Sequence, residues 1–215
     1  MASLPASTIR IDVWSDLACP WCYVGKRRLD KALDRYKSKV DFDVTWHPYM
    51  IDPRTNQAGE EYLAYNRRRW GSDGWTTALR QSGRPDGATF SDWKWWPNTL
   101  HAHRLAAFGA KHGKGHETED RLFRCIYEEG GNVSLLPTLA TLGHELELPD
   151  VGAYLESDEG REEVLQQDAH AKDKLDIHSV PCFAIANAAN QRLMLSGAQN
   201  VAAFERAFDQ MLPPS

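Results

Sequence analysis

The sequence predicts an α/β fold in which a strand–helix–strand unit and a strand–strand–helix unit are separated by a large all-helical insertion. Two observations predict it. Apolar and polar residues alternate near both ends of the chain, and a helical spacing of apolar residues, interrupted by Gly- or Pro-containing segments, fills the middle. The 215 residues, 42% hydrophobic and 26% charged, suit one globular domain, or one domain with an insertion.

The first unit is predicted from a change of period. Residues 9–14 and 40–46 alternate as strands do, whereas residues 20–37 place apolar side chains every three to five positions and basic ones on the other face. We interpret the basic residues Lys26, Arg27 and Arg28 as part of a solvated helix face. Since a helix joins the two strands, we expect them to pair in parallel through a right-handed crossover.

Helical patterns continue through the middle of the chain, over residues 61–70, 75–81, 99–112, 117–128, 135–146 and 157–175. Strands are predicted over 182–186 and 192–196, with a turn over 187–190 between them and a helix over 201–211. The predicted domains are therefore 1–52 with 177–215, interrupted by a helical insertion over 53–176. We interpret the tryptophan cluster over 93–96 as core packing.

Composition excludes several classes of function. The formal net charge of −5 offers no basic face for nucleic acid. No apolar run approaches the ~18 residues of a membrane helix, and residues 1–8 lack the pattern of a secretory signal. We expect no nucleic-acid partner, no membrane partner and a cytoplasmic location.

Two of the four cysteines, Cys19 and Cys22, flank Pro20 and Trp21 at the start of the first predicted helix. Unpaired backbone N–H groups and the positive end of the helix dipole stabilise a thiolate there, and proline suits the first helical position. Thiols in such settings have pKa values of ~3.5–7.5 instead of ~8.5. We expect Cys19 to attack, and Cys22, one turn further on and more buried, to resolve the mixed disulfide.

Cysteines also bind metal ions and pack in protein cores. A C-x-x-C pair can supply half of a zinc site, but the chain has no second C-x-x-C pair, so we predict no metal site. Cys125 falls on the apolar side of a predicted helix and is interpreted as a core residue.

Residues 15–26 (SDLACPWCYVGK) resemble the DsbA-like oxidoreductases of the FrnE subgroup, and Val180-Pro181 and residues 195–199 (LSGAQ) match the C-terminal half of that family. The resemblance covers nearly the whole chain. It implies a thioredoxin-like fold with a helical insertion, a cis peptide bond at Pro181, and pairing of the Val180 backbone with a bound substrate strand. Asp16 also matches the family pattern, either tuning the thiols or accepting a local hydrogen bond in a turn.

One residue departs from the family pattern. Cys182 follows Pro181, where relatives more often carry threonine or another uncharged residue. We favour a small buried strand residue there, and the alternatives are a third redox thiol or a third metal ligand.

The resemblance and the cysteine pair together predict dithiol–disulfide exchange on protein or small-molecule substrates, by a monomer or homodimer. Cys19 is the nucleophile, Cys22 resolves, and Pro181 shapes the docking loop. No cofactor is required, and glutathione is a candidate reductant or co-substrate. Whether the pair oxidises or reduces depends on a reduction potential that sequence does not give.

Two alternatives stay open. Kappa-class glutathione transferases and hydroxychromene-carboxylate isomerases share the expected architecture but usually carry serine in place of the cysteine. In that case Asn98, Ser196 and Gly197 would help to hold glutathione. The other alternative is a redox-sensing or metal-binding module that uses Cys19, Cys22 and Cys182.

Overall fold

A computed structural model describes residues 8–189 and 191–212 of the chain. Residues 1–7, on which part of the localisation expectation rests, and the predicted turn residue Asn190 lie outside the described residues. The two terminal units have the predicted order. They consist of β1 (Thr8–Ser15), α1 (Pro20–Tyr36) and β2 (Asp41–Pro48), and of β5 (Cys182–Ala186), β6 (Arg192–Ser196) and α9 (Val201–Met211).

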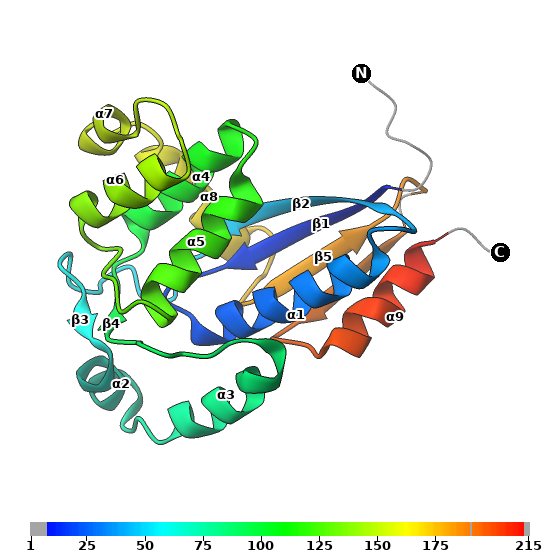
Figure 1. Ribbon diagram of the computed structural model, residues 1–215, viewed down its shortest axis with the longest axis horizontal. Helices are drawn as coiled ribbons and strands as arrows, with labels where there is room; N and C mark the ends of the chain where they lie inside the picture. The colour runs from blue at the N-terminus through cyan, green and yellow to red at the C-terminus, as the bar shows by residue number, and fades with distance from the viewer. Residues whose placement is uncertain (1–7, 190, 213–215) are drawn as a thin grey trace.

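These units share one four-stranded sheet of order β2-β1-β5-β6. As predicted, β1 pairs with β2 in parallel, whereas β1–β5 and β5–β6 are antiparallel. The helices α1 and α9 lie side by side along one face of the sheet (Figure 1). Alternation turns Ile11 and Val13 of β1 toward that face, where they are buried in one cluster with Phe204 and Phe208 of α9.

The insertion contains seven α-helices among the described residues: α2 (Tyr62–Trp70), α3 (Trp75–Gly83), α4 (Leu100–Lys111), α5 (Gly115–Tyr127), α6 (Leu136–Glu145), α7 (Val151–Glu156) and α8 (Arg161–Asp173). It also holds a 3₁₀ turn (Arg84–Asp86) and a small antiparallel pair of strands, β3 (Glu60–Glu61) and β4 (Trp95–Trp96). The helices α4, α5 and α8 pack against β2. In Figure 1, α2 and α3 lie apart from the other helices of the insertion, with α3 near the first turns of α1.

Two details of the predicted insertion are wrong. The helix expected from residue 157 begins only at Arg161, because Gly160 has a left-handed backbone (φ 74°) that ends any continuous helix there. The helix α7 and the β3–β4 pair were not predicted. A six-residue helix and two-residue strands are too short to show a period, and they form through contacts with distant segments.

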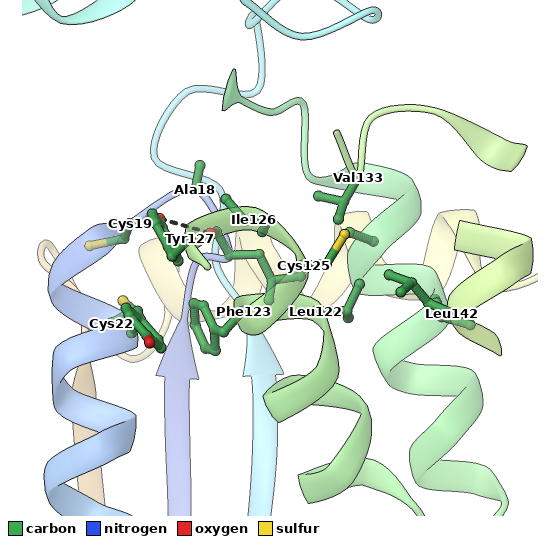
Figure 2. Packing of buried hydrophobic residues seen from close by; sticks show 14 of the residues in the cluster. Ala18, Cys19, Cys22, Leu122, Phe123, Cys125, Ile126, Tyr127, Val133 and Leu142 are labelled. Atoms are coloured by element: carbon green, nitrogen blue, oxygen red, sulfur yellow. Dashed lines mark hydrogen bonds between the residues drawn. The ribbon is translucent and has the colours of Figure 1, made fainter. Parts of the chain in front are cut away.

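The core of the insertion is continuous with the start of α1. Cys22 and Tyr23 of α1 belong to the same buried cluster as Phe123 and Tyr127 of α5, and Figure 2 shows Cys22, Phe123 and Tyr127 close together. Since this core crosses the predicted boundary at residue 53, the division into two domains stays a prediction. No helix in the described part of the chain has the length and apolar composition that a membrane crossing requires.

Two tryptophans of the cluster over 93–96, Trp93 and Trp96, pack in the core. Trp93 stacks on Tyr62 with ring centroids 4.2 Å apart, and Trp96 stacks on Tyr65 at 4.1 Å. Both tryptophans are buried. The interpretation as core packing is confirmed for these two residues.

Candidate active site

Cys19 occupies the residue immediately before α1. Its backbone is extended (φ −84°, ψ 110°), Pro20 follows as the first helical residue, and no described side chain caps the helix. The Cys22 and Tyr23 N–H groups donate to the Cys19 carbonyl at 3.0 and 3.3 Å, so the backbone of Cys19 itself closes the first turn of α1. All four cysteines are free thiols.

Both thiols of the pair are buried, and Cys22 is the less exposed of the two. Its side chain is 1% exposed, against 5% for Cys19. Burial raises the pKa of Cys22 well above its ordinary value, and the hydrogen bond and negative charge of Cys19 raise it further, whereas the Asp16 backbone and the Ser15 hydroxyl lower it. Cys22 therefore holds its proton more tightly than an exposed thiol does, and it is less exposed than Cys19.

A loop from the other end of the chain lies against Cys19. The peptide bond between Val180 and Pro181 is cis, and the Val180 carbonyl oxygen lies 3.8 Å from Cys19 Sγ, which donates to it. A Cβ added at Gly25 of α1 would lie 3.0 Å from Pro181 Cγ. The loop is thus seated directly on the first turns of α1.

Two of the residues expected to bind substrate border this loop, and one does not. Gly197 donates its backbone N–H to the Pro181 carbonyl at 2.8 Å, and Ser196 pairs with Cys182 across β5 and β6. The Asn98 side chain instead donates to the Thr55 carbonyl. Asn98 lines a separate cavity of about 890 Å³ that does not include Cys19. A role of these residues in binding stays a prediction.

Cys182 faces away from the pair. It belongs to a small cluster with Tyr49, Ala171 and Ile177, whereas the next residue, Phe183, points to the α1 face of the sheet. Burial raises the pKa of Cys182. This placement matches the small buried strand residue that we favoured.

Cys125 is also set apart from the pair. Figure 2 shows it packed near Leu122 and Val133, with α5 between it and Cys22. Burial raises its pKa to about 11, as a core residue requires. Among the described residues, no group of three or more His, Cys, Asp or Glu side chains is arranged to hold a metal ion.

Asp16 holds the turn that leads into Cys19. Its carboxylate accepts the Ala18 N–H at 3.0 Å and the Ile51 N–H at 2.7 Å, which accords with the turn interpretation. His103 Nε2 lies 3.6 Å from Asp16 Oδ1, and both side chains are buried. No sequence pattern marks His103 as part of the site, because only the packing of α4 brings it here.

Glu119 provides a second buried carboxyl group, which interacts with the charges of His103 and Asp16. Glu119 is 1% exposed, and its Oε2 has no hydrogen-bond partner among the described residues. Burial raises the pKa of Glu119 to about 7, an effect opposed by the charges of His103 and Lys26 and reinforced by that of Asp16.

The interpretation of the basic residues of α1 as a solvated face is wrong. Lys26 is 1% exposed and pairs with Asp30 at 2.7 Å and with Asp120 of α5 at 3.2 Å. Arg27 also pairs with Asp120, and Arg28 pairs with Asp86 at 2.7 Å. Asp86 and Asp120 of the insertion cover this face of α1. Contacts between segments so far apart leave no periodic pattern in the sequence.

An apolar pocket of about 310 Å³ opens beside Cys19. We call it the tryptophan pocket, and its lining residues are Cys19, Pro20, Trp21, Ile51, Trp70, Trp75 and Trp96. Sequence patterns do not reveal the last four of these residues as part of the site, because they come from segments other than the one that holds Cys19. The abundance of tryptophan, 8 in 215 residues, was the only available signal.

The comparisons with known proteins agree with this geometry. The DSBA-like thioredoxin domain matches residues 10–209. The chain belongs to this family. The FrnE subgroup within it stays a prediction.

Individual relatives cover nearly all of this DSBA-like chain. An uncharacterized protein of Bacillus subtilis (strain 168), YwbO, is 27% identical over 93% of this chain and 96% of its own. The structure of the probable DsbA oxidoreductase SCO1869 from Streptomyces coelicolor superposes with a TM-score of 0.79 at 23% identity, over 96% and 93% of the two chains. A 2-hydroxychromene-2-carboxylate isomerase superposes with a TM-score of 0.68 at 15% identity, over 94% and 95%.

Proposed function

We propose that the chain is a thiol–disulfide oxidoreductase that acts through Cys19 and Cys22. One observation carries the proposal. The Cys19 thiol lies at the N-terminus of α1, against the Val180 carbonyl, and the buried Cys22 thiol lies one helical turn further on. Membership of the DSBA-like family supports the same reading.

The exchange proceeds in two displacements. The Cys19 thiolate attacks one sulfur of a substrate disulfide, so that a Cys19–substrate disulfide forms and the other substrate sulfur leaves as a thiolate. Cys22, having lost its proton, attacks Cys19 Sγ and releases the second substrate thiolate. Two electrons pass to the substrate, the released thiolates take up two protons, and Cys19 and Cys22 end as a disulfide. The reverse sequence oxidises a substrate dithiol.

The proposed setting is a reducing cytoplasm, where reductase or isomerase action is favoured over bulk oxidation. The chemistry takes place between cysteine sulfurs, so the proposal includes no bound cofactor. Glutathione is a candidate small thiol for returning the pair to its reduced form. The substrates are protein or small-molecule disulfides.

Turnover of insulin disulfides with dithiothreitol as reductant tests the proposal. We expect Cys19→Ser to reduce turnover at least 100-fold. Cys22→Ala should instead accumulate a mixed disulfide with substrate, visible by mass spectrometry without reductant. Cys125→Ala, which alters a thiol remote from the pair, is the control and should retain turnover. Full turnover by Cys19→Ser would overturn the proposal.

A second candidate is glutathione-dependent transfer or isomerisation. The fold shared with the 2-hydroxychromene-2-carboxylate isomerase is the observation that favours it. The two candidates separate in the double variant Cys19→Ser/Cys22→Ser. Transferase or isomerase turnover that survives in this variant supports the second candidate, and its loss supports disulfide exchange.

A further inference from the structure

The cavity of about 890 Å³ that Asn98 lines has no role in the proposed disulfide exchange, because neither Cys19 nor Cys22 is part of its wall. We call it the arginine cavity. Arg54, from the loop after β2, and Arg161, the first residue of α8, both line it. The first turns of α4 and α6 complete the wall.

The charge of the wall is positive. Neither the Arg54 nor the Arg161 guanidinium makes a hydrogen bond or an ion pair with another group in the described part of the chain. The described residues that line the cavity include no aspartate or glutamate, although the whole chain has a formal net charge of −5. An anion that enters the cavity therefore meets two guanidinium groups whose charges no carboxylate has neutralised.

His101 adds a neutral donor to this wall. Arg104 Nη1 lies 2.8 Å from His101 Nδ1. Since a guanidinium only donates, Nδ1 accepts, and the ring proton is on Nε2. Burial lowers the pKa of His101, the charges of Arg104 and Arg161 lower it further, and the charge of Asp158 opposes them. The ring is therefore neutral, and Nε2–H is its free donor.

The acceptor groups of the wall are already occupied. Asn98 Oδ1 accepts a backbone N–H at the start of α4, and the Asn98 amide donates to the Thr55 carbonyl. Ser134 Oγ accepts the Asn98 N–H, and Asn56 Oδ1 accepts the N–H two residues further on. These bonds hold the wall in place and leave mainly donors free. Such a wall favours a ligand that is rich in acceptor oxygens.

The size of the cavity and its apolar residues indicate an organic ligand. The volume of about 890 Å³ is near the upper end of the ~300–1,000 Å³ of small-ligand pockets, far more than an inorganic ion fills. Leu100, Leu136 and Leu165 also line it. They gain free energy when they cover carbon atoms of a ligand. A ligand that fits therefore joins an anionic group to an apolar body.

We propose that the arginine cavity binds a small organic phosphate, with the phosphate on Arg54, Arg161 and His101 and the organic body against the leucines. Two guanidinium groups and one Nε2–H offer more donors than a single carboxylate can accept. A phosphate monoester presents three oxygens and a charge of about −1.5 to −2 to them. This site is separate from the dithiol, and the proposal does not rest on the proposed function.

Isothermal titration calorimetry of the full chain with phenyl phosphate tests the proposal. We expect a Kd below about 1 mM at low ionic strength. Benzoate has the same ring but one carboxylate, and inorganic phosphate has no ring. Each should bind at least about tenfold more weakly, because benzoate leaves donors unpaired and inorganic phosphate leaves the leucines uncovered. Benzamidine, a cation with the same ring, should not bind.

The binding must depend on the two arginines. Arg54→Met and Arg161→Met should each weaken phenyl phosphate binding at least about tenfold, since each removes a charged donor. Both arginines are exposed, so each variant should unfold at the same urea concentration as the wild type. Arg206→Met is the control. It removes the same charge from an exposed position of α9 outside the cavity and should leave the Kd unchanged.

Several results would overturn the proposal. One is the absence of measurable binding of phenyl phosphate to wild-type protein, and another is a Kd that Arg54→Met and Arg161→Met leave unchanged. An equal loss in Arg206→Met shows a response to net charge alone. Inorganic phosphate that binds as tightly as phenyl phosphate shows an adventitious ion only, and equally tight benzoate excludes selectivity for phosphate.

Discussion

Cys19 Sγ lies 3.8 Å from the carbonyl oxygen of Val180, a residue 161 positions further along the chain. The contact exists because β5 pairs with β1 and carries the Val180-Pro181 loop to the start of α1. Gly25 permits the approach, since its missing side chain leaves room for the Pro181 ring. The active site thus depends on one close packing contact between the two ends of the fold.

Replacement of Gly25 by alanine tests this contact. The added methyl group would lie 3.0 Å from Pro181 Cγ and 3.3 Å from Phe183 Cζ, so we expect the loop to move away from Cys19. Overpacking of this kind costs about 1–3 kcal/mol of stability, and we expect disulfide exchange to slow about tenfold. Insulin turnover and urea unfolding measure the two effects.

Gly152→Ala is the matched control. It lies in α7, where an added Cβ meets nothing within 4 Å, so alanine should be neutral or stabilising by up to about 1 kcal/mol. A Gly25→Ala protein with wild-type turnover would show that the Gly25–Pro181 contact does not position the loop.

The four thiols should differ in reactivity. At pH 7.5 we expect iodoacetamide to modify Cys19 at least tenfold faster than the others, because burial raises the pKa values of Cys22, Cys125 and Cys182. Mass spectrometry of tryptic peptides at timed intervals measures each rate. Protein unfolded in urea should label all four alike. If Cys182 is modified as fast as Cys19 in the folded protein, this result supports a redox role for Cys182.

Glu119 should make stability depend on pH. Burial raises its pKa to about 7, so the folded protein holds this proton more tightly than the unfolded chain does. Its carboxyl group therefore opposes folding increasingly as the pH rises from about 4.5 to 7. In Glu119→Gln this penalty is absent, and the variant should gain about 2 kcal/mol over wild type between pH 5 and pH 8.

Urea unfolding at the two pH values measures this gain. The control is Glu117→Gln, which changes an exposed glutamate on the same helix and should follow the wild-type dependence on pH. If Glu119→Gln also follows the wild type, Glu119 is ionised in the folded protein at neutral pH.

Arg104 should be essential to the stability of the insertion. It is 1% exposed and donates hydrogen bonds to four backbone carbonyl groups near the end of α7, those of Tyr154, Leu155, Ser157 and Glu159. We expect Arg104→Met to cost about 3 kcal/mol, since buried carbonyl groups lose their donor. Arg54→Met, at an exposed site, should change the free energy of unfolding by less than about 0.5 kcal/mol.

The element order and the dithiol were accessible from sequence because both depend on local patterns. Alternation and helical spacing locate the terminal units within a few residues, and the C-P-W-C run at a helix start contains its own physical argument. The resemblance added Pro181, which local rules do not distinguish from other prolines. Short elements such as α7 were missed because six residues show no period.

The chain alone determined which sulfur chemistry is available: two cysteines one helical turn apart, with proline between them at the start of α1. Tertiary structure decided what surrounds them. It brought Val180 and Pro181 to Cys19, turned Cys182 to the other face of the sheet, and gathered Ile51, Trp70, Trp75 and Trp96 into one pocket. The physical reason is that helix capping and periodicity act between near neighbours in sequence, whereas a pocket forms from packing between distant segments.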